Sequence, residues 1–227
     1  MINDLAFLYL DLPKFNTTPD LIERLERIVD ENSFDDKHRN CRHIPIYVSG
    51  GDTLLNETTK QWSPESDQLP EIRSYIEKYV QPWAGDLGRI VVICTLPGEK
   101  NPTHIDCSRK NFANNCLEHK FRVVIRGQTD NLYFNGQDET YHINENLLQQ
   151  PFMMSGYWPH TMVNNDKTMK FTLAMGSPWD VDKDNLQYDK LILKSLAKYK
   201  SSYIGKSQMT MPTNIDEYFS DRLSKLV

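Results

Sequence analysis

Two kinds of hydrophobic spacing divide the chain into helix-rich ends and a strand-rich middle. In the first part, apolar positions recur every three or four residues over 19–31 and again over 69–79. This spacing predicts two amphipathic helices, and Thr18 before Pro19 is a typical helix start. The other expectations for this part are strands at 6–11 and 44–48, and polar loops at 32–43 and 52–67.

The pattern changes near Arg89, where short runs of β-branched and aromatic residues alternate with turn residues. Asn135-Gly136, between the runs 131–134 and 140–143, predicts a β-hairpin because this dipeptide favours tight two-residue turns. Helical spacing returns after Trp179. The remaining expected strands are 89–95, 119–126, 152–155, 161–164 and 169–175, and the expected helices are 186–198 and 215–226.

Seven or so short strands at this spacing predict a mainly β fold with flanking helices, namely a double-stranded β-helix or jelly roll. The chain of 227 residues is long enough for a substantial core and contains no internal repeat or break in composition. We therefore expect a single domain over 1–227. It would comprise a helical N-terminal part (1–88), a jelly-roll core (about 89–179) and a helical C-terminal tail (180–227).

Composition narrows the range of partners and compartments. The net charge of −5 provides no broad basic surface, so nucleic acid is an unlikely partner. The four cysteines form no C-x-x-C pair, which favours reduced thiols over a disulfide scaffold. The first fifteen residues are a poor signal peptide, and no apolar run approaches the length of a membrane span. These features predict a cytoplasmic protein without a membrane partner.

A candidate metal site begins at His104 and Asp106, which follow a predicted strand and a Pro-Gly break. Side chains alternate along an extended segment, so the imidazole and the carboxylate point to the same side. Together they could provide two of the three ligands of a 2-His-1-carboxylate iron site. His-x-Asp alone is close to a chance occurrence. His160, at the junction of two expected strands, is the candidate for the third ligand.

Cationic side chains on two expected strands could bind an anionic ligand beside this metal. Lys170 lies ten positions after His160, and Thr172 falls on the same strand face. A cation with a neighbouring hydroxyl suits a carboxylate at the far end of a ligand that chelates the metal. Lys120 and Arg122 also share one strand face and compete for this role. The alternative is that Lys120 and Arg122 are ordinary solvated strand charges.

Three segments carry a more specific signal: LPGEKNPTHID at 96–106, HKFRVVI at 119–125 and HTMVNNDKTMKFTL at 160–173. They resemble the jelly-roll Fe(II)/2-oxoglutarate-dependent dioxygenases, and most of all the aspartyl/asparaginyl β-hydroxylase group. The resemblance covers residues 90–179. It implies that Fe(II) is held by His104, Asp106 and His160. It also implies that Lys170 and Thr172 bind the 5-carboxylate of 2-oxoglutarate, where many members have Arg-x-Ser.

The lysine is a departure from the family pattern, because an ammonium is a point charge whereas a guanidinium is a bidentate fork. Lys120 and Arg122 therefore remain alternatives for the 5-carboxylate. Lys170 is the favoured residue for it, and Arg122 is then expected to contact the 1-carboxylate or the substrate. Further candidates for substrate contacts are Lys120, Trp158 and Arg109.

The implied activity is hydroxylation of an amino-acid or peptidyl side chain by dioxygen. It is coupled to oxidative decarboxylation of 2-oxoglutarate to succinate and CO2. The expected partners are thus an amino acid, a peptide or a protein, together with dioxygen. Two alternatives stay open. One is a non-catalytic jelly-roll binding protein that retains the metal triad, and the other is a cupin-like metalloenzyme that does not use 2-oxoglutarate.

Overall fold

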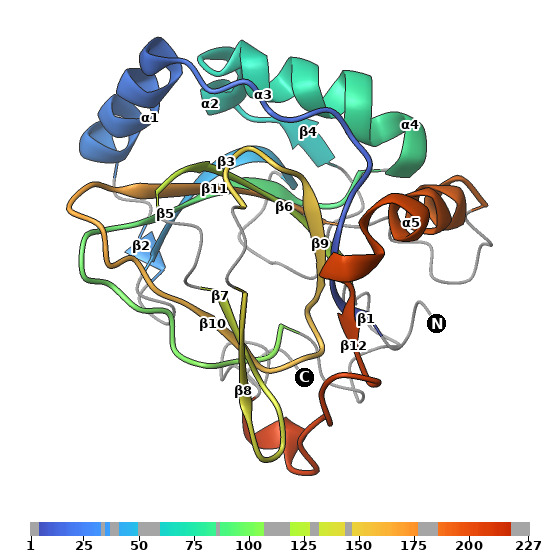
Figure 1. The fold of residues 1–227 in the computed structure, drawn as a ribbon. Helices are drawn as coiled ribbons and strands as arrows, with labels where there is room; N and C mark the ends of the chain where they lie inside the picture. The colour runs from blue at the N-terminus through green and yellow to red at the C-terminus, as the bar shows by residue number, and fades with distance from the viewer. Residues whose placement is uncertain are drawn as a thin grey trace.

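Two antiparallel sheets form the centre of the molecule (Figure 1). The computed structural model describes residues 5–32, 35–36, 41–49, 60–84, 87–106, 119–127, 132–143, 147–176 and 186–218. The larger sheet has the strand order β12-β1-β9-β6-β11-β5-β3-β2, with β4 paired to β3. Its strands are β1 (Leu5–Tyr9), β2 (Asp35–Asp36), β3 (Cys41–Ser49), β4 (Lys60–Trp62), β5 (Ile90–Thr95), β6 (His119–Arg126), β9 (Phe152–Ser155), β11 (Lys170–Gly176) and β12 (Ile204–Gly205).

The smaller sheet has the order β10-β7-β8. It contains β7 (Leu132–Asn135), β8 (Thr140–Ile143) and β10 (His160–Met162), and His104 bridges to its edge at His160. From β5 onward the chain crosses between the sheets: β6 is in the larger, β7 and β8 in the smaller, β9 in the larger, β10 in the smaller and β11 in the larger. This alternation is a double-stranded β-helix, so the predicted fold class is confirmed. The predicted hairpin is confirmed by the pairing of β7 with β8.

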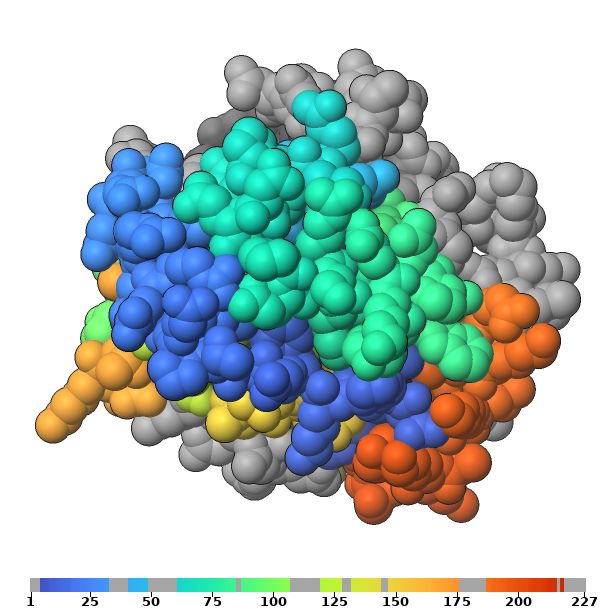
Figure 2. Space-filling view, turned by 90° about the horizontal axis from the view of Figure 1, so that it is seen from above, coloured from blue at the N-terminus to red at the C-terminus, as the bar shows by residue number. Residues whose placement is uncertain are grey.

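The two faces of the larger sheet have different partners, as period-two alternation requires. Val92, Val123 and Leu173 point outward into a hydrophobic cluster that includes Leu25 and Ile72 of the overlying helices. Figure 2 shows these helices covering the outer face: α1 (Pro19–Glu31), α2 (Pro64–Asp67), α3 (Pro70–Tyr75) and α4 (Gln81–Ala84). The residues between these outward positions face the smaller sheet.

A second cluster fills part of the space between the sheets and contains Phe134, Phe152 and Trp158. Val124 of β6 belongs to it, and in register Val124 lies opposite Thr172 of β11. Residues an even number of positions from Val124 on β6, or from Thr172 on β11, therefore also face the interior of the barrel. This placement decides where Lys120, Arg122, Lys170 and Thr172 point.

Helix α1 matches its predicted limits, and the Thr18 hydroxyl accepts a hydrogen bond from the Leu21 amide at 3.2 Å. The second predicted helix is longer than expected. A π-helical turn, Ile76–Val80, joins α3 to α4, and the Gln81 amide donates to the Ile76 carbonyl. Pro82 lies in α4, directly after the π-helical turn, and the helix continues past it to Ala84.

Two of the expected loops contain regular structure. Strand β3 begins at Cys41 because Arg42 pairs with Cys94 of β5, and β2 precedes it. The expected loop at 32–43 is therefore partly wrong. Within 52–67, β4 and α2 contradict the loop prediction, whereas 52–59 lie outside the described residues. The N-terminal part is thus not purely helical, since it also provides β1 to β4.

The C-terminal part returns to the barrel. Helix α5 (Leu186–Tyr199) matches the expected helix and packs against α4 and β1. The helix expected at 215–226 is a 3-10 turn over Ile215–Tyr218, and 219–227 lie outside the described residues. The Tyr218 carbonyl accepts a hydrogen bond of 2.8 Å from the Ile105 amide. No helix in the described ranges has the length and apolar character to cross a membrane.

Candidate metal centre

His104, Asp106 and His160 lie together at one end of the barrel interior. His104 and His160 face each other across an antiparallel bridge, with N–H to carbonyl distances of 3.0 and 2.9 Å. The Asp106 amide donates to the Gly156 carbonyl at 2.7 Å, which fixes the third backbone position. One nitrogen or oxygen atom of each side chain lies within 4.8 Å of the others, and all three residues are buried. The structure therefore brings the predicted triad together.

Both imidazoles are oriented by the carbonyl two residues before them. His104 Nδ1 lies 2.7 Å from the Pro102 oxygen, and His160 Nδ1 lies 2.8 Å from the Trp158 oxygen. A carbonyl can only accept, so each Nδ1 carries a hydrogen and Nε2 is the ring nitrogen left for a metal. Each Nε2 lies 3.5 Å from a carboxylate oxygen of Asp106. Burial, with a smaller effect of the His104 ring, lowers the pKa of His160 to about 3.

These donors fit a divalent iron ion. Two imidazole nitrogens and one carboxylate oxygen, all within 4.8 Å of one another, are the donors of a 2-His-1-carboxylate iron site. Asp106 is only 4% exposed, and a buried carboxylate needs compensating positive charge, which a divalent ion would supply together with the Lys120 ammonium. The carbonyl acceptors at both Nδ1 atoms are the supports that metal-binding histidines usually have.

Lys120 reaches this centre from β6, and its Nζ lies 2.6 Å from Asp106 Oδ2. Register confirms that Lys120 and Arg122 share one strand face, because they pair with Met154 and Phe152 of β9 respectively. Lys120 thus lies at the metal end of the barrel interior. Its ammonium pairs with the carboxylate of a candidate metal ligand.

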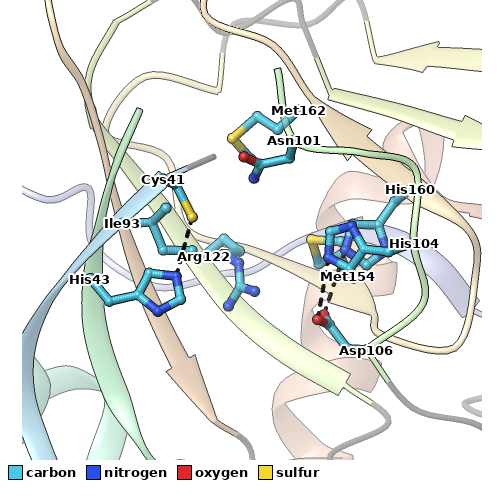
Figure 3. A pocket seen from close by; sticks show the side chains of 10 residues that line it. All are labelled: Cys41, His43, Ile93, Asn101, His104, Asp106, Arg122, Met154, His160 and Met162. Carbon is cyan, nitrogen blue, oxygen red and sulfur yellow. Dashed lines mark hydrogen bonds and ion pairs between the residues drawn. The ribbon is translucent and has the colours of Figure 1, made fainter. Parts of the chain in front are cut away.

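A pocket extends from the triad between the two sheets (Figure 3). Arg122 is 7% exposed and points into the middle of this pocket, between His43 and the triad. At the end away from the triad, Cys41 Sγ lies 3.4 Å from His43 Nε2. The residues that line the pocket besides the triad are Cys41, His43, Ile93, Asn101, Arg122, Met154 and Met162.

Lys170 and Thr172 lie on the inner face of β11. Thr172 pairs with Ile93, which lines the pocket, and its hydroxyl is 3.9 Å from Met162 Sδ. Lys170 is two positions along the strand and is only 1% exposed. A Cβ on Gly127 would lie 2.8 Å from Lys170 Cγ, so the backbone of Gly127 closes directly over this side chain.

The lesser substrate candidates have different surroundings. The Trp158 side chain is in the hydrophobic cluster between the sheets, and its carbonyl supports His160. Its substrate role stays a prediction. Arg109 lies outside the described residues.

Several residues of the pocket were not predicted from the sequence. Cys41 and His43 are inward-facing residues of β3, and their alternate spacing before an apolar run was the available signal. Met154 and Met162 look like core residues in the sequence. Asn101 has no distinguishing sequence signal except its place three positions before His104.

No family model and no curated protein matches this sequence. Solved structures with a similar arrangement include a 2OG-Fe(II) oxygenase family oxidoreductase from Burkholderia pseudomallei, with 10% identity over 70% of this chain and 80% of that one, at a TM-score of 0.44. A Trichoplax adhaerens prolyl hydroxylase, in complex with a hypoxia inducible factor peptide fragment, is 10% identical to this chain. The match covers 83% of this chain and 87% of the hydroxylase, with a TM-score of 0.49. A Pseudomonas putida prolyl-4-hydroxylase is 13% identical, and the match covers 75% of this chain and 92% of that one, with a TM-score of 0.43. Similarities at these levels do not assign the chain to a family.

Proposed function

We propose that this protein is an Fe(II)/2-oxoglutarate-dependent oxygenase that hydroxylates an amino-acid or peptidyl side chain. The observation that carries the proposal is the buried triad of His104, Asp106 and His160, with both histidine Nδ1 atoms fixed by carbonyls. The pocket that opens from the triad supports it further, since a small ligand could reach the metal from this side.

When bound, Fe(II) and 2-oxoglutarate supply the oxidative chemistry, in which dioxygen hydroxylates a C–H bond while 2-oxoglutarate becomes succinate and CO2. The chain itself holds the ligands in one geometry and limits the access of water. Burial lowers the pKa of His160, so its imidazole stays neutral and available to the metal. The carboxylate of Asp106 provides the single negative charge among the three protein ligands.

For 2-oxoglutarate we propose Lys170 and Thr172 as the contacts of the 5-carboxylate, with Arg122 near the 1-carboxylate or the substrate. A buried lysine beside a threonine hydroxyl on the inner face provides a charge-assisted hydrogen-bond donor for the distal carboxylate. Lys120 is the weaker candidate for this role because it lies at the metal end, 2.6 Å from Asp106 Oδ2, whereas the 5-carboxylate is the end of the ligand distant from the metal.

The substrate class rests on the sequence resemblance to the aspartyl/asparaginyl β-hydroxylase group, which favours a free amino acid, a peptide or a protein. Lys120, Trp158 and Arg109 remain proposed substrate contacts. The cytoplasmic location and the single-domain organisation also stay predictions.

The test is succinate formation from 2-oxoglutarate by purified protein with Fe(II), ascorbate and air, measured without and with candidate peptides. We expect succinate from the wild type and a loss of at least about a hundredfold for His104→Ala, since removing a ligand abolishes the facial geometry. His142→Ala is the matched control, because His142 stacks on Tyr133 at 4.4 Å on the other face of the smaller sheet.

The two alternatives give different results in the same experiment. A protein that binds Fe(II) but neither binds nor turns over 2-oxoglutarate would be a cupin-like metalloenzyme. A protein whose thermal stability is unaffected by metal and by 2-oxoglutarate would be a non-catalytic binding protein, because a ligand that binds the native state must raise its stability.

A separate experiment tests the contact of the 5-carboxylate. The affinity for 2-oxoglutarate is measured by calorimetry with Mn(II), which avoids turnover, for Lys170→Met and Lys120→Met. We expect Lys170→Met to weaken binding by about tenfold to a hundredfold, the usual effect of one charge-assisted hydrogen bond. A greater loss in Lys120→Met than in Lys170→Met would assign the 5-carboxylate to Lys120 instead.

A further inference from the structure

Asn101 has a buried side chain in the pocket wall, and the proposed function gives it no role. The residue is 7% exposed and lines the same pocket as the triad. Its Oδ1 is buried and has no hydrogen-bond partner among the residues that the structure describes. A buried amide oxygen in this state is unfavourable, and most such groups in native proteins have a partner. If the amide is rotated by 180°, a buried N–H donor stands at this position instead, and a ligand oxygen could accept from it.

The backbone of Asn101 explains why the side chain points inward. Its amide donates to the Met162 carbonyl at 2.9 Å, and its carbonyl accepts a short hydrogen bond from the Thr161 hydroxyl. Both backbone groups are thus bonded to β10. The side chain is left to face the pocket, where Figure 3 shows it beside Met162 and across from Arg122.

The position of Asn101 lies between the two ends of the proposed 2-oxoglutarate site. His104, a candidate metal ligand, follows three positions later in the same segment. On the other side, Met162 borders Thr172, since its Sδ is 3.9 Å from the threonine hydroxyl. A ligand that extends from the metal toward Thr172 therefore passes the amide of Asn101.

We propose that the Asn101 side chain is a binding contact for a carboxylate of 2-oxoglutarate, to which its Nδ2 donates a hydrogen bond. This inference rests on the proposed function, because it requires the dicarboxylate to occupy this pocket. Rotation of the amide by 180° exchanges Oδ1 and Nδ2, so the side chain can present its donor to the ligand. Asn101 and Arg122 then hold the co-substrate from the two opposite walls.

The test measures the dissociation constants of Mn(II) alone and of 2-oxoglutarate in the presence of Mn(II), by calorimetry on the full chain. For Asn101→Ala we expect 2-oxoglutarate binding about tenfold to a hundredfold weaker, with the constant for Mn(II) unchanged within about twofold. The backbone bonds of residue 101 do not involve the side chain, so the melting temperature should stay near that of the wild type. Asn32→Ala, whose Nδ2 donates to Ile28 on α1, is the control.

Asn101→Asp identifies the direction of the hydrogen bond. A carboxylate at this position cannot donate and repels the co-substrate, so we expect Asn101→Asp to bind 2-oxoglutarate more weakly than Asn101→Ala. Binding of 2-oxoglutarate by Asn101→Asp as tight as in the wild type would overturn the proposal, because the side chain would then donate no hydrogen bond to the ligand.

The other outcomes separate this inference from the function on which it rests. Wild-type binding of Mn(II) and 2-oxoglutarate, with unchanged affinity in Asn101→Ala, would overturn the inference and leave the proposed function standing. The inference would also be overturned if Asn101→Ala changed only the KM of the peptide or amino-acid substrate that is hydroxylated. A wild-type protein that binds no 2-oxoglutarate would overturn both.

Discussion

Gly127 is the residue at which a single added methyl group should disturb the proposed co-substrate site most directly. It follows β6 with a φ of +113°, a conformation that residues with a Cβ rarely adopt. A Cβ at this position would lie 2.8 Å from Lys170 Cγ, 2.9 Å from Lys170 Cβ and 3.2 Å from Lys170 Cα. Gly127→Ala therefore combines backbone strain with an overlap against a buried side chain.

The two contributions can be separated by a matched variant. The strained backbone costs about 1–3 kcal/mol, and displacing a packed side chain costs about 1–3 kcal/mol more. Gly98 also has a positive φ, +77°, but a Cβ there would meet no atom within 4 Å. Gly98→Ala should thus show only the first cost, and the difference between the variants should be about 1–3 kcal/mol.

The free energy of unfolding is measured by urea denaturation of both variants and the wild type. We expect Gly127→Ala to be the less stable variant, and to bind 2-oxoglutarate more weakly because Lys170 has moved. If Gly127→Ala were no less stable than Gly98→Ala, the overlap with Lys170 would have no energetic effect. The reasoning about this contact would then be refuted.

Three further predictions concern single ionisable groups. Lys120→Met should destabilise the metal-free protein by about 2–4 kcal/mol, because it removes the ammonium group that pairs with the buried Asp106 carboxylate. Added Mn(II) should then raise the melting temperature of this variant more than that of the wild type. Asp11 accepts a hydrogen bond from Lys198, which lowers the pKa of this carboxyl in the folded protein. The ionised Asp11 therefore stabilises the fold at neutral pH, and this stabilisation is lost as the pH falls through the pKa of the folded state. In urea denaturation, Asp11→Asn should be less stable than the wild type at pH 7, with the difference disappearing in acid. Burial raises the pKa of the Cys94 thiol to about 12, so peptide mapping after thiol alkylation at pH 8 should find Cys94 labelled only in the unfolded protein.

The sequence was sufficient for the strand-rich core and for the triad, because both depend on local alternation. Inward and outward positions of β5, β6 and β11 follow directly from the period of two. His104 and Asp106 share a face for the same reason. His160 was identifiable because it starts a strand after a turn, although its partner across the bridge could not be read from spacing alone.

The start of β3 was missed because its inward residues are polar. Cys41 and His43 face the pocket, where polar residues replace the apolar ones that normally reveal a strand. The supports of the two imidazoles were also beyond prediction, since the carbonyls of Pro102 and Trp158 are main-chain groups that every residue possesses. Asn101 belongs to this class too, because only its surroundings distinguish it from a loop asparagine.

The pairing of strand β1 limits how early the larger sheet can form while the chain is being synthesised. It pairs on one side with β9 and on the other with β12, which are both made long after it. A fold that depends on such distant contacts is expected to form slowly. The bond from Ile105 to the Tyr218 carbonyl extends this dependence to the segment between two candidate iron ligands. The main-chain hydrogen bond of Ile105 can therefore form only after residue 218 has been made and released from the ribosome.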